Sequence, residues 1–126
     1  MSLKNASIRT EHPIEVLQGG LKDTDPQPIA PIEHECTRQT GLLHKKWTLS
    51  TARFAPGETY GSFFVCMRDE PVLDRGGERH PDGLGFAAFG AVVRGFTTLE
   101  AIFARQEPDE FMKNEIGIRS AVIIDG

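Results

Sequence analysis

The sequence predicts a mainly β fold, an antiparallel barrel or sandwich with one appended helix. Three observations lead to this prediction: several short apolar or alternating runs, one helical capping pattern, and turn residues between the runs. With 126 residues, 39% of them hydrophobic and 25% charged, the chain has the size and composition of one globular domain with a single core. We expect this domain at residues 6–126, and a leader or disordered segment at residues 1–5.

Five stretches have the pattern of strands, either as short apolar runs or through alternation of two faces. They are residues 14–17, 46–53, 62–67, 87–93 and 121–124. The run 62–67 is almost continuously apolar, which is typical of a strand that is buried on both sides. Its Cys66 is therefore expected to be a buried free thiol, and a disulfide with Cys36 is not expected.

One helix and three loops complete the predicted order. Thr97 and Glu100 have the spacing of a capping box, so we expect Thr97 to cap a helix that runs to about Arg105. The apolar face of this helix is formed by Leu99, Ile102 and Phe103. The loops, rich in Pro, Gly and Asp, are residues 21–31, 54–61 and 68–85. Because long loops in compact domains are often functional, we expect the last of them to serve the site.

Composition and motifs argue against several classes of function. The net charge is −4 and no basic cluster exceeds a pair of lysines, so nucleic acid binding is not expected. The apolar runs are too short to cross a membrane and no secretion signal is visible, so we expect a cytoplasmic protein. No nucleophile elbow is present. A metal site is not expected either, because no ligand spacing occurs among the histidines, which are His12, His34, His44 and His80.

An ordered set of passages extends through most of the chain. It consists of Val16-Leu17-Gln18-Gly19-Gly20, Gly41-Leu42-Leu43-His44, Leu49-Ser50-Thr51-Ala52-Arg53, Gly61-Ser62-Phe63-Phe64-Val65-Cys66, Pro71-Val72-Leu73-Asp74 and a run from Gly85 to Phe96. In this order they resemble the cyclophilin-type peptidyl-prolyl cis-trans isomerases, where S-x-F-F-I precedes a Leu-Asp turn and F-x-x-F-G-x-V-x-x-G. The resemblance implies a cyclophilin-like antiparallel β-barrel, a closed eight-stranded sheet with helices capping its ends.

The resemblance also implies that the first part of the barrel is missing. The family normally begins with a strand hairpin and a helix, and this chain has only residues 1–5 in their place. Removing strands from a closed barrel leaves unpaired N–H and C=O groups on the neighbouring strands. Three outcomes are open: the remaining sheet closes with fewer strands, a homo-oligomer covers the exposed edges, or the protein is poorly stable.

The function that the resemblance implies is rotation about Xaa-Pro peptide bonds in proline-containing peptides or unfolded protein chains, which assists protein folding. This isomerisation breaks no covalent bond, so it requires no cofactor or metal. Matched residue by residue, Arg9 is the catalytic arginine that donates to the amide nitrogen, and Gln18 orients the substrate backbone. The matched substrate-binding residues are Val16, Ala52, Phe64, Val72, Leu73 and Phe86.

Two alternatives to the enzyme remain open. The first is a non-catalytic module of the same fold, which binds a proline-containing segment through Phe64 and Leu73 but lacks a positioned arginine. The second is a fold fragment that is ordered by self-association and has no site. Because Ser7 and Ile8 replace the aromatic pair that precedes the family's arginine, we expect the isomerase activity to be weak.

Overall fold

A computed structural model describes residues 4–5, 14–21, 25–53, 59–77, 82–107 and 112–124 of the chain. Its strands are β1 (Lys4–Asn5), β2 (Val16–Gly20), β3 (Thr48–Arg53), β4 (Thr59–Cys66) and β5 (Ala88–Ala91). Its helices are α1 (Thr37–Thr40), the 3-10 helix η1 (Pro71–Leu73) and α2 (Phe96–Phe103). The prediction of a mainly β fold with one clear helix is therefore confirmed.

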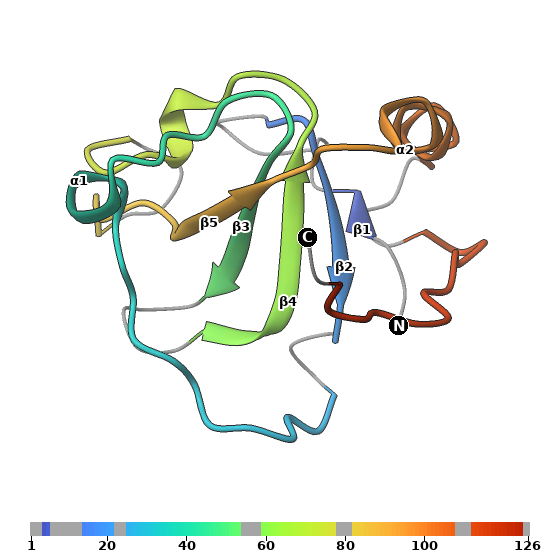
Figure 1. The fold of residues 1–126 in the computed structure, drawn as a ribbon, viewed down its shortest axis with the longest axis horizontal. Coiled ribbons are helices and arrows are strands. Elements are labelled where there is room, and N and C mark those ends of the chain that lie inside the picture. Colours follow the sequence, from blue (N-terminus) through green and yellow to red (C-terminus); the bar gives the residue numbers. More distant parts are fainter. Residues whose placement is uncertain are drawn as a thin grey trace.

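The five strands form one antiparallel sheet in the order β1-β2-β4-β3-β5 (Figure 1). The central strands β2, β4 and β3 make the longest pairings, and β1 and β5 lie at the two edges. Over the described residues the sheet is open, because β1 and β5 do not pair with each other. The closed barrel that the resemblance implied is thus not formed by these strands.

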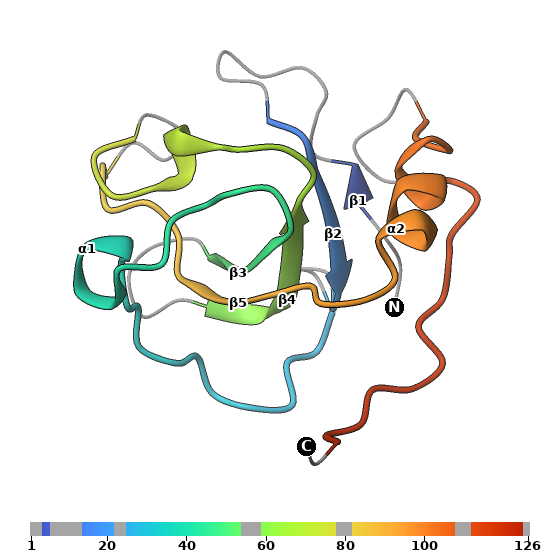
Figure 2. The ribbon, with the colours of Figure 1, turned by 45° about the horizontal axis from the view of Figure 1, so that its top comes forward.

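Two apolar clusters lie on opposite faces of the central strands, because successive residues of a strand point to opposite sides. We call the first the η1 cluster; it contains Ile14, Val16, Phe64, Cys66 and Leu73, with Val72 and Phe86 packed against it. The second is the α2 cluster, which contains Leu17, Val65, Met67 and, among others, Leu99, Ile102 and Phe103 of α2. Helix α2 therefore covers one face of the sheet through the apolar residues that the sequence predicted (Figure 2).

Strand boundaries differ from the predicted ones where glycines allow a close approach. The predicted strand 14–17 is observed as β2, which continues through Gly19 and Gly20. Gly20 has φ +97°, and a Cβ there would lie 2.5 Å from the Gly61 carbonyl oxygen of β4. The two glycines thus permit pairing instead of ending the strand. Likewise, β4 begins at Thr59, so the predicted loop 54–61 is wrong for its last three residues.

Helix α2 begins two residues earlier than the capping box predicted, because its N-cap is Gly95 and not Thr97. Gly95 is the N-cap in the left-handed conformation with φ +86°, and its carbonyl accepts from the Leu99 N–H at 3.1 Å. The Thr97 capping box is therefore wrong, because the glycine turn already starts the helix. Helix α1 was not predicted, since four residues are too few for a periodic pattern. It is capped locally, with the Cys36 N–H donating to Gln39 Oε1 at 2.9 Å.

The predicted closing strand 121–124 is also wrong. Residues 112–124 run on from the α2 region as an extended segment that is not a strand (Figures 1 and 2). Val122, Ile123 and Ile124 are 78%, 99% and 71% exposed. The apolar pattern of a strand is present, but a strand also needs a hydrogen-bonded neighbour, and no described strand pairs with this segment. Cys36 and Cys66 are buried free thiols, as predicted for Cys66.

Candidate functional site

The strand register brings the predicted site residues to one face of the sheet. Phe64 of β4 lies opposite Gln18 of β2 on one side and opposite Ser50 of β3 on the other. Directly paired residues share a face, so these three side chains form one row across three strands. Val16 lies two residues from Gln18 and therefore points to the same face. This is the face that carries the η1 cluster.

Five of the predicted substrate-binding residues pack together in the η1 cluster. They are Val16, Phe64, Val72, Leu73 and Phe86. Phe64 lies among them, with the ring of Phe86 meeting it edge-on at 5.8 Å and 84°. Phe64 and Leu73 are almost completely buried, at 4% and 1% exposure, whereas Val72 and Phe86 are partly exposed. The apolar surface that a ligand can reach is thus offered first by Val72 and Phe86.

Gln18 is fixed at the edge of this cluster by its side-chain amide. Its Nε2 donates to Ser62 Oγ at 2.8 Å and lies 3.3 Å from Tyr60 Oη. The Ser62 hydroxyl in turn donates to the Gly19 carbonyl oxygen at 3.0 Å. The amide is therefore held in one orientation by side chains of β4, as a residue that orients a peptide requires.

The other two predicted site residues are Ala52 and Arg9, and neither is among the described members of the η1 cluster. Ala52 is buried on β3 beside a register shift between Thr51 and Arg53, and it is not a member of the η1 cluster. Arg9, the predicted catalytic arginine, lies outside the described residues.

A buried arginine at the site was not predicted from the sequence. The side chain of Arg53 is fully buried, and its Nε donates to the Gly85 carbonyl oxygen at 2.9 Å, as does its Nη2. Nη1 and Nη2 donate to the Asp82 carboxylate at 2.9 and 3.1 Å. The guanidinium carbon lies 5.2 Å from the centre of the Phe86 ring. Arg53 thus ties the segment before β5 to β3 and supports the Phe86 wall.

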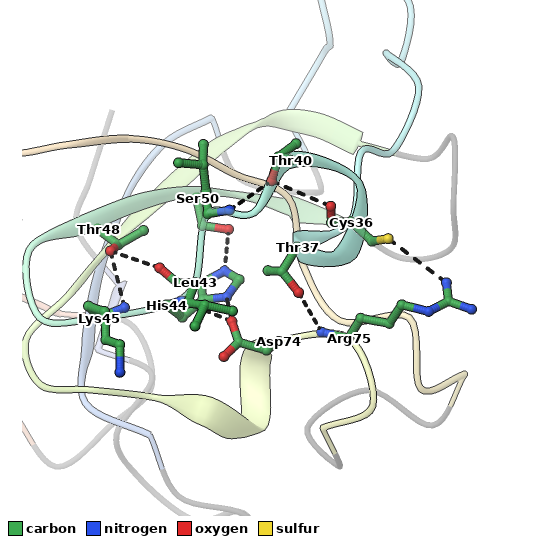
Figure 3. Close-up of polar contacts among 11 residues, drawn as sticks. Cys36, Thr37, Thr40, Leu43, His44, Lys45, Thr48, Ser50, Asp74 and Arg75 are labelled. Atoms are coloured by element: carbon green, nitrogen blue, oxygen red, sulfur yellow. Dashed lines mark hydrogen bonds and ion pairs between the residues drawn. The ribbon is translucent and has the colours of Figure 1, made fainter.

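A buried histidine, His44, bridges β3 and the residue that follows η1 (Figure 3). His44 is 1% exposed, and its Nδ1 lies 2.7 Å from Asp74 Oδ1 while its Nε2 lies 2.9 Å from Ser50 Oγ. The His44 backbone N–H donates to the same carboxylate oxygen at 2.8 Å. A carboxylate only accepts, so Nδ1 carries the proton, and Nε2 accepts from the Ser50 hydroxyl.

The series Asp74, His44 and Ser50 has the order of a hydrolase triad, but it cannot act as one. Ser50 is 0% exposed, so no substrate carbonyl reaches its hydroxyl. Burial lowers the pKa of His44 and outweighs the opposing effect of Asp74, so the ring is held neutral. The three residues therefore form a structural network behind the η1 cluster.

His44 and Arg53 both lie in passages on which the family resemblance rests, but no sequence pattern indicated their partners. Asp74 is 30 residues from His44, and Asp82 is 29 residues from Arg53. Contacts of such range leave no periodicity that a local pattern could reveal. Among the described residues, no group of three or more His, Cys, Asp or Glu side chains is arranged to hold a metal ion. Nor is any helix in these ranges long and apolar enough to span a bilayer.

Comparison with known proteins agrees with this arrangement. The sequence profile described as cyclophilin type peptidyl-prolyl cis-trans isomerase/CLD matches residues 4–123. The chain is also 32% identical over 91 residues to the peptidyl-prolyl cis-trans isomerase cyp18 of Streptomyces antibioticus. That alignment covers 69% of this chain and 53% of the relative, so the chain spans about half the length of this curated relative. The profile covers nearly the whole sequence, and the chain belongs to the cyclophilin-type peptidyl-prolyl cis-trans isomerase family.

Proposed function

We propose that this chain catalyses cis-trans isomerisation of Xaa-Pro peptide bonds in proline-containing peptides or unfolded chains. One observation carries the proposal: Phe64 of β4 packs with four other predicted residues, drawn from β2, η1 and the segment before β5, beside the fixed amide of Gln18. An apolar floor with walls suits a proline ring, and an adjacent amide suits the peptide backbone.

The energetics of the reaction assign a task to each part of the site. Uncatalysed rotation takes tens to hundreds of seconds over a barrier of about 18–20 kcal/mol. Shortening this to milliseconds requires roughly 5.5 kcal/mol. A hydrogen bond from a guanidinium to the twisted amide nitrogen contributes about 1.5–3 kcal/mol, the role proposed for Arg9. The remainder comes from excluding water around the twisted amide, which the η1 cluster does while it holds the proline ring in place.

A coupled proline-isomerisation assay on a short Xaa-Pro peptide tests this proposal. The expected result is weak but measurable activity in the wild type, most of which Arg9→Ala removes. Phe64→Ala should lower kcat/KM at least tenfold, because it removes the floor. Phe63→Ala is the matched control, since Phe63 is the neighbouring residue on β4 and points to the opposite face.

Each other outcome has a distinct meaning. Equal activity in the wild type and Arg9→Ala would remove Arg9 from the mechanism. No turnover, with retained binding of the peptide, would favour the non-catalytic module that binds proline-containing segments. Equal losses in the Phe64 and Phe63 variants would show that the η1 cluster is not the site.

We further propose that a homo-oligomer covers the open sheet in solution and that the protein is cytoplasmic. Phe89 on the edge strand β5 is 56% exposed and lines an apolar cavity of about 180 Å³ together with Ile29, Ile32 and Phe63. Exposed apolar edges favour pairing with another chain. Light scattering should find more than one chain per particle, and Phe89→Lys should return a monomer.

The proposal that the protein is cytoplasmic is supported by its two free thiols, which are in keeping with a reducing compartment.

A further inference from the structure

The ring of Phe64 stacks against a buried polar side chain. The imidazole of His44 stacks on the Phe64 ring, with the ring centres 6.0 Å apart and the planes inclined by 17°. Phe86 meets the same ring edge-on. Phe64 is therefore held between a parallel ring behind it and a perpendicular ring beside it, and both arrangements are favourable for aromatic pairs.

The orientation of the His44 ring is fixed by two different elements. Ser50 on β3 donates to Nε2, and Asp74, which follows η1, accepts from Nδ1–H. Rotating the ring about its Cβ–Cγ bond would break both bonds inside the protein, where an unsatisfied polar group is costly. The surface against which Phe64 stacks thus has one position.

His44 also fixes the wall of the pocket relative to this floor. Its backbone N–H donates to Asp74 at 2.8 Å, and its carbonyl oxygen accepts from the Glu70 N–H at 2.8 Å. Glu70 and Asp74 directly flank η1, the helix that carries Val72 and Leu73. One residue therefore holds both ends of the wall with its backbone and side chain, and the floor with its ring.

We propose that His44 is a positioning residue of the site, which sets the place of the Phe64 ring by stacking against it. This inference rests on the proposed isomerase function, because Phe64 is assigned as the floor of the proline pocket. The residue touches neither substrate nor reacting atoms. It acts through Phe64, and its ring, more than its hydrogen bonds, determines how well the pocket fits a proline.

Two variants separate the ring from the hydrogen bonds. His44→Asn keeps a donor near Asp74 but removes the ring. His44→Phe keeps an aromatic ring but removes the acceptor of the Ser50 hydroxyl and the ring N–H that donates to Asp74, which retains the backbone N–H of residue 44. We expect His44→Asn to raise KM about fivefold, the size expected for losing one aromatic pair. Its kcat should change less than twofold, since the floor binds the proline ring in both the ground and twisted states. His44→Phe should keep KM within twofold, although its melting temperature falls.

A third variant controls for stability alone. Thr48→Val removes the bonds that the Thr48 hydroxyl makes with Lys45 and Leu43 without touching Phe64. It should lower the melting temperature and leave KM unchanged. The inference is overturned if KM in the three variants rises in proportion to the loss of melting temperature, because His44 would then be only a structural residue.

The test also distinguishes this inference from the proposed function. If the wild type shows no turnover, the isomerase proposal fails, and the variants are compared through the NMR signals of the Phe64 ring. His44→Asn should then shift these signals and speed the flipping of the ring, while His44→Phe should keep the flipping rate near that of the wild type. Equal flipping rates in the wild type and His44→Asn would overturn the positioning role.

Discussion

Replacing Gly85 by alanine should damage the fold and the pocket wall together. Gly85 has φ +70°, a conformation that costs a residue with a side chain about 1–2 kcal/mol. A Cβ there would lie 2.5 Å from the Leu73 carbonyl oxygen and 2.6 Å from the Asp74 carbonyl carbon. These are backbone atoms that cannot rotate away, so overpacking adds about 1–3 kcal/mol. We expect a total loss of about 3 kcal/mol in the free energy of unfolding.

The same change should weaken the binding of substrate. The Leu73 carbonyl oxygen accepts from the Phe86 N–H at 2.9 Å, so moving it loosens the contact between the two walls of the pocket. Gly83→Ala is the matched control, because Gly83 has a similar φ of +68° but no atom within 4 Å of a Cβ. It should cost about 1 kcal/mol.

Thermal unfolding and the coupled isomerisation assay measure these two effects. At about 4 °C per kcal/mol for a chain of this size, the melting temperature of Gly85→Ala should fall by about 12 °C and that of Gly83→Ala by about 4 °C. KM should rise only in Gly85→Ala. Equal losses of stability in the two variants would refute the close contact with the Leu73 carbonyl, and an unchanged KM would refute the link to the wall.

Three further predictions follow from buried groups. Burial lowers the pKa of His44, so below about pH 6.5 the unfolded chain binds more protons than the folded one. The free energy of unfolding should therefore decline as the pH falls from about 6.5, by at most about 1.4 kcal/mol per pH unit. In urea titrations at several pH values, His44→Phe should remove this part of the pH dependence. Iodoacetamide should label Cys36 before Cys66, as judged by mass spectrometry. Burial raises the pKa of both thiols, to about 12 for Cys66, but at Cys36 the backbone N–H groups and Arg75 outweigh this effect and lower the pKa. Earlier labelling of Cys66 would contradict this prediction. Asp82→Asn should lower the free energy of unfolding, measured in urea, by about 1–2 kcal/mol, because it weakens the ion pair with Arg53. The loss is smaller than for a fully buried pair because the Asp82 side chain is 27% exposed. Asp69→Asn is the control, and an equal effect of the two substitutions would contradict the prediction.

Local patterns in the sequence predicted those parts of the fold that depend on neighbouring residues. Alternation located β3, the continuous apolar run located the core of β4, and the spacing of Leu99, Ile102 and Phe103 identified the face of α2 that packs on the sheet. Predictions failed where a distant partner decides the structure. Gly19 and Gly20 continue a strand because they pair with Phe63 and Ser62 of β4, and residues 121–124 are not a strand because no described strand pairs with them.

The site was predictable in its apolar members and not in its polar supports. Phe64 and Leu73 could be matched through the passages that contain them, and the register then places them together. The pairs Arg53–Asp82 and His44–Asp74 could not be matched in this way. Each pair joins β3, or the loop that precedes it, to the segment 70–86. The folded structure, and not a local pattern, decides which carboxylates of this segment point inward.

The open sheet and the assembled site are compatible because they involve different strands. The members of the η1 cluster are Ile14, Phe86 and residues of β2, β4 and η1, and the pairing of β2 with β4 alone sets the register of Val16, Gln18 and Phe64. Among the described strands, the edges of the sheet are β1 and β5, which lie on the two sides of this centre. A second chain that pairs with an edge strand would therefore leave the η1 cluster accessible. Assembly and catalysis should then respond to different substitutions, so that Phe89→Lys changes the number of chains per particle and leaves KM for an Xaa-Pro peptide unchanged.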